Sequence, residues 1–358
     1  MKNIASYNYN ADFIRSVAII FVVILHVTAI FITQSIQTNT SFWWMLLITE
    51  TSTKVAVPLF IMLSGQLILD PSKEYTLIDF YKRRISKLGI PIIFWPFFYY
   101  FCFLFLKRID LNFAKLVNDF VFLNMFYHLY FLYIIFGLYL FTPFIKKTLK
   151  TSTMAEKKAL MAGSFVFSAM VATLVYALPT KINYWSIFTV FIPFLCYFLA
   201  GDFLRHVTPT KKALYSCLAL FVGVTIIVSV CKFFAYENTN IYLIRYLSDA
   251  LSVGVMVQSV LAFIILLNVT RYKSFLTSIP TTKVIHTLAA ASFGIYIIHP
   301  MLLFGYGIVI NSKSLAPYFA SFPSLLSLIM TFSVAFGASF AIVYIGAKIR
   351  FVKLLLAS

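Results

Sequence analysis

Arg15 and His26 are the two residues of this chain whose types and spacing point most directly to chemistry. Both lie in one long apolar stretch near the N-terminus, where an ionisable side chain is costly and indicates a functional site by default. An eleven-residue step on an α-helix makes about three full turns, so the two side chains share one face, with Cα atoms roughly 16 Å apart along the axis. Asp12, three residues before Arg15, is expected to pair with it and to orient the guanidinium group.

This arrangement suits a long anionic ligand. Arg15, at the cytoplasmic edge, would bind the phosphates of such a ligand while its reactive end reaches His26, past the middle of the membrane; coenzyme A thioesters have that shape. A neutral imidazole can take the proton from a hydroxyl group as that hydroxyl attacks a thioester carbonyl. The alternative interpretation is a boundary arginine that snorkels to the interface, together with a histidine that hydrogen-bonds a neighbouring helix.

A basic cluster follows the second apolar stretch and comprises Arg83, Arg84 and Lys87. One interpretation is that these side chains fix the orientation of the chain and contact lipid headgroups. The other is that they also contact the phosphates of coenzyme A. Both can hold together.

Four aromatic or histidine side chains later in the chain are candidates for binding the acceptor. His128 and Tyr130 lie near the outer end of a predicted span, where they form either an interfacial aromatic belt or a platform for a sugar. Tyr296 and His299 are three residues apart, so they are neighbours on one helix face and are candidates to line a site.

Two further motifs favour structural roles. Glu50 and Lys54 are four residues apart within one apolar stretch and are expected to pair, which neutralises two costly charges. Ser64 precedes Gly65, but no nucleophile-elbow pattern surrounds it, and a Ser-Gly pair is a common device of helix packing.

The elements that must position these residues are membrane-spanning helices. Of the 358 residues, 61% are hydrophobic and only 11% are charged, which excludes a soluble enzyme, and the grouping of the apolar residues into long stretches excludes a transmembrane β-barrel. We therefore predict an all-α polytopic membrane protein with about ten spans in one bundle, and a single membrane domain over 1–358. The predicted spans are 13–34, 43–69, 89–106, 124–145, 162–178, 186–204, 214–235, 246–268, 288–309 and 324–346.

The basic residues predict the orientation of the chain. With the N-terminus inside, the inner set of connections holds 21 Lys and Arg residues, whereas the outer set holds seven, Lys232 among them. Both termini are therefore expected to be cytoplasmic. The net charge of +18 is explained by this anchoring rather than by nucleic-acid binding, and the lipid bilayer is the expected partner of the basic surface.

Neither a metal site nor a permanently bound cofactor is expected. The five histidines and the few carboxylates show no ligand spacing, and the four cysteines form no CxxC pair.

Several of these residues belong to motifs that occur in order along the chain. They are Arg15-x10-His26 after Asp12, Val57–Gly65, Phe80–Pro91, Tyr127–Leu132 with Tyr139–Pro143, Tyr197–Gly201 and Ser292–Pro300. This series resembles the acyltransferase 3 family of integral membrane O-acyltransferases, and most of all its short stand-alone members that acetylate surface polysaccharides. At two positions the chain departs from the family: Tyr130 stands where Trp is frequent, and Lys87 stands where Arg is frequent.

The resemblance implies transfer of an acyl group, most often acetyl, from cytoplasmic acyl-CoA to a carbohydrate hydroxyl. It implies that His26 is the key catalytic residue and that Arg15 is important for activity. It also places the chain in the cytoplasmic membrane of a bacterium. The acceptor could be modified on either side of the membrane, and the depth of His26 favours a route through it. A polytopic transporter or flippase of lipid-linked sugar is the alternative, because aromatic residues in the spans could stack on sugars.

Overall fold

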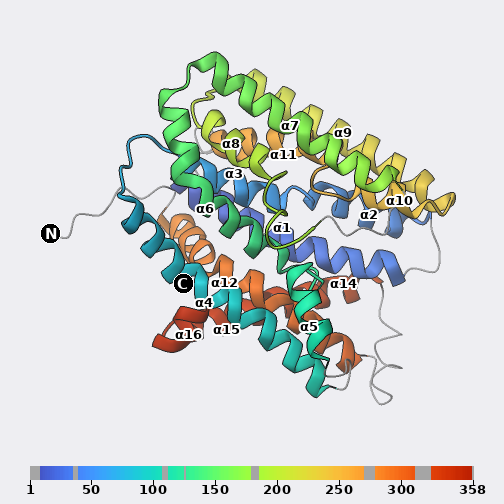
Figure 1. Ribbon diagram of the computed structural model, residues 1–358. Coiled ribbons are helices and arrows are strands. Elements are labelled where there is room, and N and C mark those ends of the chain that lie inside the picture. Colours follow the sequence, from blue (N-terminus) through green and yellow to red (C-terminus); the bar gives the residue numbers. More distant parts are fainter. Residues whose placement is uncertain are drawn as a thin grey trace. The chain divides into compact units, whose positions relative to one another are not determined.

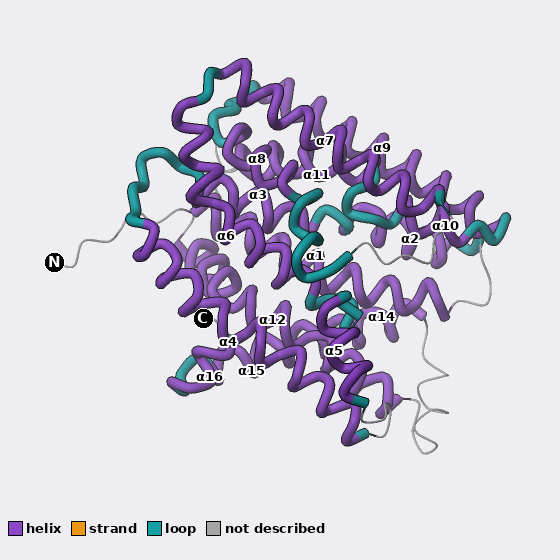
Figure 2. The backbone as a smooth tube through the Cα atoms, in the orientation of Figure 1, coloured by secondary structure: helices purple, strands orange, loops and turns teal. Residues whose placement is uncertain are grey.

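The structure is a computed structural model in which most of the described residues are helical. It describes residues 9–34, 39–106, 112–124, 126–178, 185–269, 279–310 and 324–356. No strand occurs in this described part of the chain, as Figures 1 and 2 show. Eight of its helical segments are long and apolar enough to cross a membrane. The prediction of an all-α polytopic membrane protein is confirmed.

Each predicted span overlaps a helical segment, although the bounds differ by up to twelve residues. The eight long segments are Tyr9–Thr33, Ser41–Ile68, Leu77–Phe105, Tyr130–Thr151, Met154–Ala177, Lys211–Glu237, Thr281–Ile308 and Ser324–Gly346. The predicted spans 186–204 and 246–268 contain shorter helices, α8 (Leu195–Leu204) and α11 (Val253–Asn268). Turns precede α8 up to Phe194, and they include Pro193, which has no N–H to donate and therefore suits the entry to a helix better than its interior.

The chain forms two compact units. Unit 1 comprises Met1–Leu63 and Arg205–Ile345, and unit 2 comprises Ser64–Leu204 and Gly346–Ser358. Unit 1 contains α1 (Tyr9–Gln34), α2 (Ser41–Thr53), the first part of α3 (Ala56–Ile68), α9 (Lys211–Glu237), α10 (Ile241–Leu247), α11, α12 (Ile279–Ile310), α14 (Ser324–Ser333), the π-helical turn η3 (Val334–Ala338) and α15 (Ser339–Gly346). Unit 2 contains the end of α3, α4 (Leu77–Phe105), α5 (Phe113–Val121), α6 (Tyr130–Thr151), α7 (Met154–Ala177), α8 and α16 (Arg350–Leu355). The single membrane domain and the cytoplasmic termini stay predictions.

Helices α1 and α12 of unit 1 pack against each other and run parallel. Near the beginning of both, the Ser16 hydroxyl donates to the backbone oxygen of Ile285 (3.0 Å). Further along both, the ring of His26 stacks on the ring of His299. Contacts that advance together along two chains require parallel helices, which agrees with the prediction that these are the first and the ninth spans.

Helix α9 lies against both α2 and α11 in unit 1. Trp43 of α2 is buried and packs edge-on against the rings of Phe233 and Tyr236 of α9. The buried Gln258 of α11 donates to the buried Thr225 of α9 (2.7 Å), so each supplies the other with a hydrogen-bond partner inside the unit. These contacts hold α9 beside α2 and α11.

The second predicted span is broken at Lys54 and Val55, where a turn separates α2 from α3. Pro58 explains the break, because a proline ring clashes with the backbone carbonyl four residues earlier, which here is that of Lys54. Helix α3 starts again with the bond from the Leu59 N–H to the Val55 carbonyl (2.9 Å). A lysine therefore stands at a helix break in the middle of an apolar segment.

Gly65 allows α3 and α8 to approach closely in unit 2. A Cβ atom built at Gly65 would lie 1.9 Å from the backbone oxygen of Phe198, a contact that no side chain can relieve. The Ser64 hydroxyl accepts a hydrogen bond from Tyr139 (3.4 Å). The Ser-Gly pair thus contributes to helix packing here, as the sequence predicts.

We expect Gly65→Ala to lower the free energy of unfolding by about 1 to 3 kcal/mol, because the new methyl group forces two backbones apart. Gly163→Ala is the matched control: nothing lies within 4 Å of its built Cβ, and alanine is the better helix former. Thermal unfolding of the two variants in one detergent measures the difference. Equal midpoints would contradict the close contact.

Candidate functional site

A polar cluster lies near the beginning of α1 and α12 and is centred on Asp12. One oxygen of this buried carboxylate accepts from Arg15 Nη1 (2.8 Å), and the other accepts from His286 Nδ1 (2.8 Å). The predicted pairing of Asp12 with Arg15 is confirmed. The side chain of Arg15 keeps 36% of its surface accessible, so its guanidinium group is oriented by Asp12 and is still open to a ligand.

His26 faces α12 further along the same helix. Its ring centroid lies 5.3 Å from that of His299, with 27° between the planes. His299 is fully buried, whereas His26 keeps part of its surface accessible. Two imidazoles in this arrangement offer proton-accepting nitrogens in an apolar setting, which general-base chemistry requires.

The hydrogen bonding of His299 fixes its tautomer. Its Nδ1 lies 3.0 Å from the backbone oxygen of Ile295, and because a carbonyl only accepts, Nδ1 must carry the proton. In the neutral ring Nε2 therefore carries the lone pair. Tyr296 lies beside His299, with ring centroids 6.3 Å apart, so these two predicted site residues share one face of α12 with the His26 contact.

A buried ionic cluster joins α2 and α9. Glu50 accepts from Lys54 at one carboxylate oxygen (2.8 Å) and from Lys232 at the other (2.6 Å). Lys232 is 1% exposed and also donates to the Thr51 hydroxyl (3.3 Å). Helix α2, which carries Glu50, packs against α1, which carries His26.

The predicted pairing of Glu50 with Lys54 is confirmed, whereas the predicted location of Lys232 is wrong. The sequence places Lys232 in the outer connections, but it lies inside α9 with its ammonium group on Glu50. Its removal from that set strengthens the charge asymmetry between the two sides. Spacing within one helix found the first pair, but it could not find a partner that lies 182 residues away.

Unit 2 contains a basic pocket where the loop before α4 meets the start of that helix. A cavity of about 350 Å³ is lined by Tyr75, Phe80, Arg83, Arg84, Ser86 and Lys87. The three predicted phosphate-binding residues are therefore brought together. The guanidinium group of Arg83 lies over the ring of Tyr75 (5.5 Å), and that of Arg84 lies over Tyr139 (5.0 Å).

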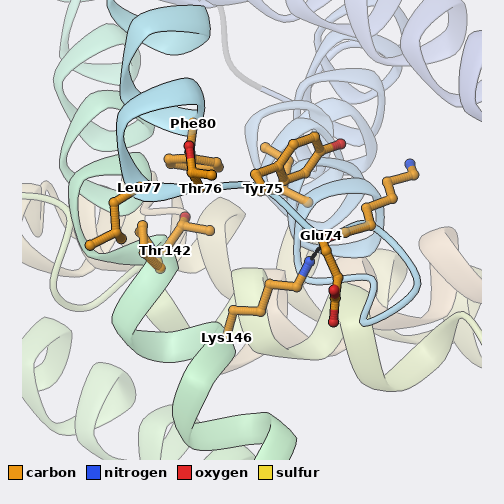
Figure 3. Close-up of a pocket in the computed structure, with 10 residues that line it drawn as sticks. Glu74, Tyr75, Thr76, Leu77, Phe80, Thr142 and Lys146 are labelled. Atoms are coloured by element: carbon orange, nitrogen blue, oxygen red, sulfur yellow. Dashed lines mark hydrogen bonds between the residues drawn. The ribbon is translucent and has the colours of Figure 1, made fainter.

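A second cavity of about 260 Å³ shares Tyr75 and Phe80 with the first and extends toward α6 (Figure 3). Lys146 of α6 reaches across it and donates to the backbone oxygen of Lys73. Its ammonium group also lies 5.6 Å from the Tyr75 ring centroid. Tyr75 thus lies near two cations and lines both cavities, and nothing in its sequence surroundings singles it out.

His128 and Tyr130 lie at the start of α6 in unit 2. His128 is buried and packs edge-on against Tyr99, with ring centroids 5.0 Å apart. Tyr130 is partly exposed and lies 6.4 Å from the ring of Phe194. Their role toward an acceptor stays a prediction.

The structure thus brings some predicted residues together and adds others. Asp12 and Arg15 form one cluster, His26 lies with Tyr296 and His299 in unit 1, and Arg83 lies with Arg84 and Lys87 in unit 2. Sequence reasoning missed Tyr75, Lys232 and His286. His286 is the nearest ionisable residue before the predicted span 288–309, and that position was the only sign of it in the sequence.

The family whose model matches this chain is described as an acyltransferase domain, and the match covers residues 8–347. No curated protein and no solved structure matches the chain.

Proposed function

Since this chain belongs to the acyltransferase 3 family of membrane acyltransferases, we propose that it transfers an acyl group from acyl-CoA to a carbohydrate hydroxyl, with His26 as the general base. Acetyl is the acyl group we propose, and a cell-surface carbohydrate or its lipid-linked precursor is the proposed acceptor. The proposed location is the cytoplasmic membrane of a bacterium.

The stacked pair of His26 and His299 is the observation that carries the proposal. Neutral His26 takes the proton of the acceptor hydroxyl while the hydroxyl oxygen bonds to the thioester carbon. The π electron pair of the carbonyl group moves to the carbonyl oxygen. When this tetrahedral anion collapses, the C–S bond breaks, its electron pair goes to sulfur, and the imidazolium of His26 returns the proton to give free coenzyme A. We propose that Tyr296 and His299, together with His128 and Tyr130, contact the acceptor.

The donor is proposed to bind through its phosphates. Arg15 presents an accessible guanidinium group that Asp12 orients, and Arg83, Arg84 and Lys87 supply a basic pocket. Arginine suits this role because its fork of donors matches a phosphate group. The exposed ring of Tyr75 adds an aromatic surface for the nucleotide base.

We expect Arg83→Ala to raise the KM for acetyl-CoA about tenfold with kcat unchanged, because it removes one charge-assisted contact that is equally strong in the ground and transition states. An acetyl thioester of pantetheine, which lacks the nucleotide phosphates, should show no difference between variant and wild type. Lys158→Ala, at an exposed lysine of α7, is the control. An equal rise in KM for both donors would contradict phosphate binding by Arg83.

The experiment that tests the proposed function is acyl transfer by the purified wild-type protein in proteoliposomes. It uses radiolabelled acetyl-CoA with a mixed pool of glycans and lipid-linked sugars as acceptors. We expect label in a carbohydrate fraction, as an ester that mild base removes. Movement of lipid-linked sugar across the bilayer with no acetyl transfer would reject the proposal in favour of transport.

A further inference from the structure

The cluster of Glu50, Lys54 and Lys232 carries a net charge of +1 inside an apolar segment. Within the part of the chain that the structure describes, Glu50 is the only acidic side chain that forms an ion pair with either lysine. A single Glu–Lys pair would be neutral and would serve to join two helices. The second lysine adds a charge whose burial is costly in a membrane protein unless it has a use.

The two lysines differ in their access to a ligand. Lys232 is fully buried, and its ammonium group already contacts Glu50 and Thr51. The side chain of Lys54 keeps 20% of its surface accessible and uses one ion pair, so its ammonium group retains hydrogen-bonding capacity. Lys54 also stands at the helix break that Pro58 causes, where α2 has ended and α3 has not begun.

Acyl transfer creates an anion at the position that such a cation would stabilise. As the acceptor oxygen attacks, the carbonyl oxygen gains a full negative charge, and a preorganised donor in a site of low dielectric stabilises that charge far more than water does. No donor for this oxygen can be named from the sequence. Lys54 follows the end of α2, and this helix packs against α1, which carries His26, the proposed base at the same reacting centre.

We propose that Lys54 is a catalytic residue that donates a hydrogen bond to the anionic oxygen of the tetrahedral intermediate. Glu50 and Lys232 are positioning residues: Glu50 holds the ammonium group of Lys54, and Lys232 leaves the cluster with the positive charge that an anion requires. Lys54 stays protonated throughout, and His26 alone moves the proton. This inference rests on the proposed function, because it names the donor for that reaction.

The test compares wild type with Lys54→Met and Lys54→Arg in the acetyl-transfer assay. We expect Lys54→Met to lower kcat about 100- to 1,000-fold, as the loss of one oxyanion donor does, while the affinity for acetyl-CoA stays unchanged. Lys54→Arg keeps the charge and should recover part of the rate. Lys158→Met, at an exposed lysine, is the control for the chemistry of the substitution.

Binding of acetyl-CoA and the unfolding midpoint of each variant separate catalysis from folding. If Lys54→Met binds acetyl-CoA, unfolds at a normal temperature and keeps the wild-type kcat, Lys54 does not act on the anion. If Lys54→Met raises only the KM for acceptors that carry an acidic group and leaves kcat unchanged, the inference is also overturned. Lys54 would then bind the acceptor before the reaction instead of stabilising the anionic oxygen. If Lys54→Met does not fold, full activity of Lys54→Gln, which has no charge, overturns it instead. If the wild-type protein transfers acetyl and His26→Ala abolishes this transfer, the proposed function stands whatever the Lys54 variants do. If the wild-type protein transfers no acetyl, both the proposed function and the role of Lys54 are overturned.

Discussion

Replacing His26 with alanine should lower kcat for acetyl transfer by about 10²- to 10⁴-fold, because a positioned general base contributes that much to a proton-transfer step. The KM for acetyl-CoA should change little. Arg15 lies about three turns away on the same helix, and the basic pocket involves other residues, so the phosphate contacts remain.

Two controls make this result specific. His206→Ala removes an exposed histidine that follows α8 and should leave kcat unchanged. His26→Gln keeps a planar polar group against His299 but cannot act as a base near neutral pH, so it should be as inactive as the alanine variant. If His26→Gln retains wild-type activity, the ring of His26 has a packing role and another group takes the proton.

The same variants distinguish a general base from a covalent acyl-histidine. In the general-base route no bond to the thioester carbon breaks before the acceptor arrives, so acetyl-CoA alone should release no stoichiometric burst of free coenzyme A. If wild type instead releases a burst of about one equivalent of free coenzyme A, and His26→Ala releases none, the reaction passes through an acyl-enzyme. Rapid quenching with thiol detection measures it.

Much of the fold and part of the site could be predicted because both depend on local patterns. Apolar stretches of sufficient length identify spans, and the eleven-residue step from Arg15 to His26 places both on one face of α1 whatever packs against it. The pairs Asp12–Arg15 and Glu50–Lys54 follow from helical spacing in the same way, and both occur.

The contacts that depend on tertiary structure could not be predicted. His286 meets Asp12 and Lys232 meets Glu50 only because α12 packs on α1 and α9 packs on α2, and no residue spacing encodes either contact. The break at Lys54 is a different case. Pro58 is a sequence signal for this helix break. A proline within an apolar span is often tolerated, however, so the sequence alone predicts a continuous span.

Replacing Glu50 with glutamine should strongly destabilise unit 1. It leaves the ammonium groups of Lys54 and Lys232 without their shared counter-charge, and loss of one partner from a buried ion pair costs about 3 to 5 kcal/mol. We expect the unfolding midpoint in detergent to fall sharply. Glu74→Gln is the matched control, because Glu74 pairs with Lys150 in an exposed position and should have little effect.

A double variant tests whether this cost comes from charge rather than from shape. In Glu50→Gln/Lys232→Met one buried ammonium group is removed together with the carboxylate, so the repulsion between two lysines disappears and much of the lost stability should return. If the double variant loses as much unfolding free energy as the two single variants lose in sum, the coupling is contradicted. Losses at independent sites are additive, whereas losses within one ionic network are not. Recovery of stability with kcat still low would separate the role of Glu50 in folding from its role in holding Lys54 at the reacting oxygen. The fold needs only that the buried charges be balanced, whereas the chemistry needs one of them to remain positive and in place.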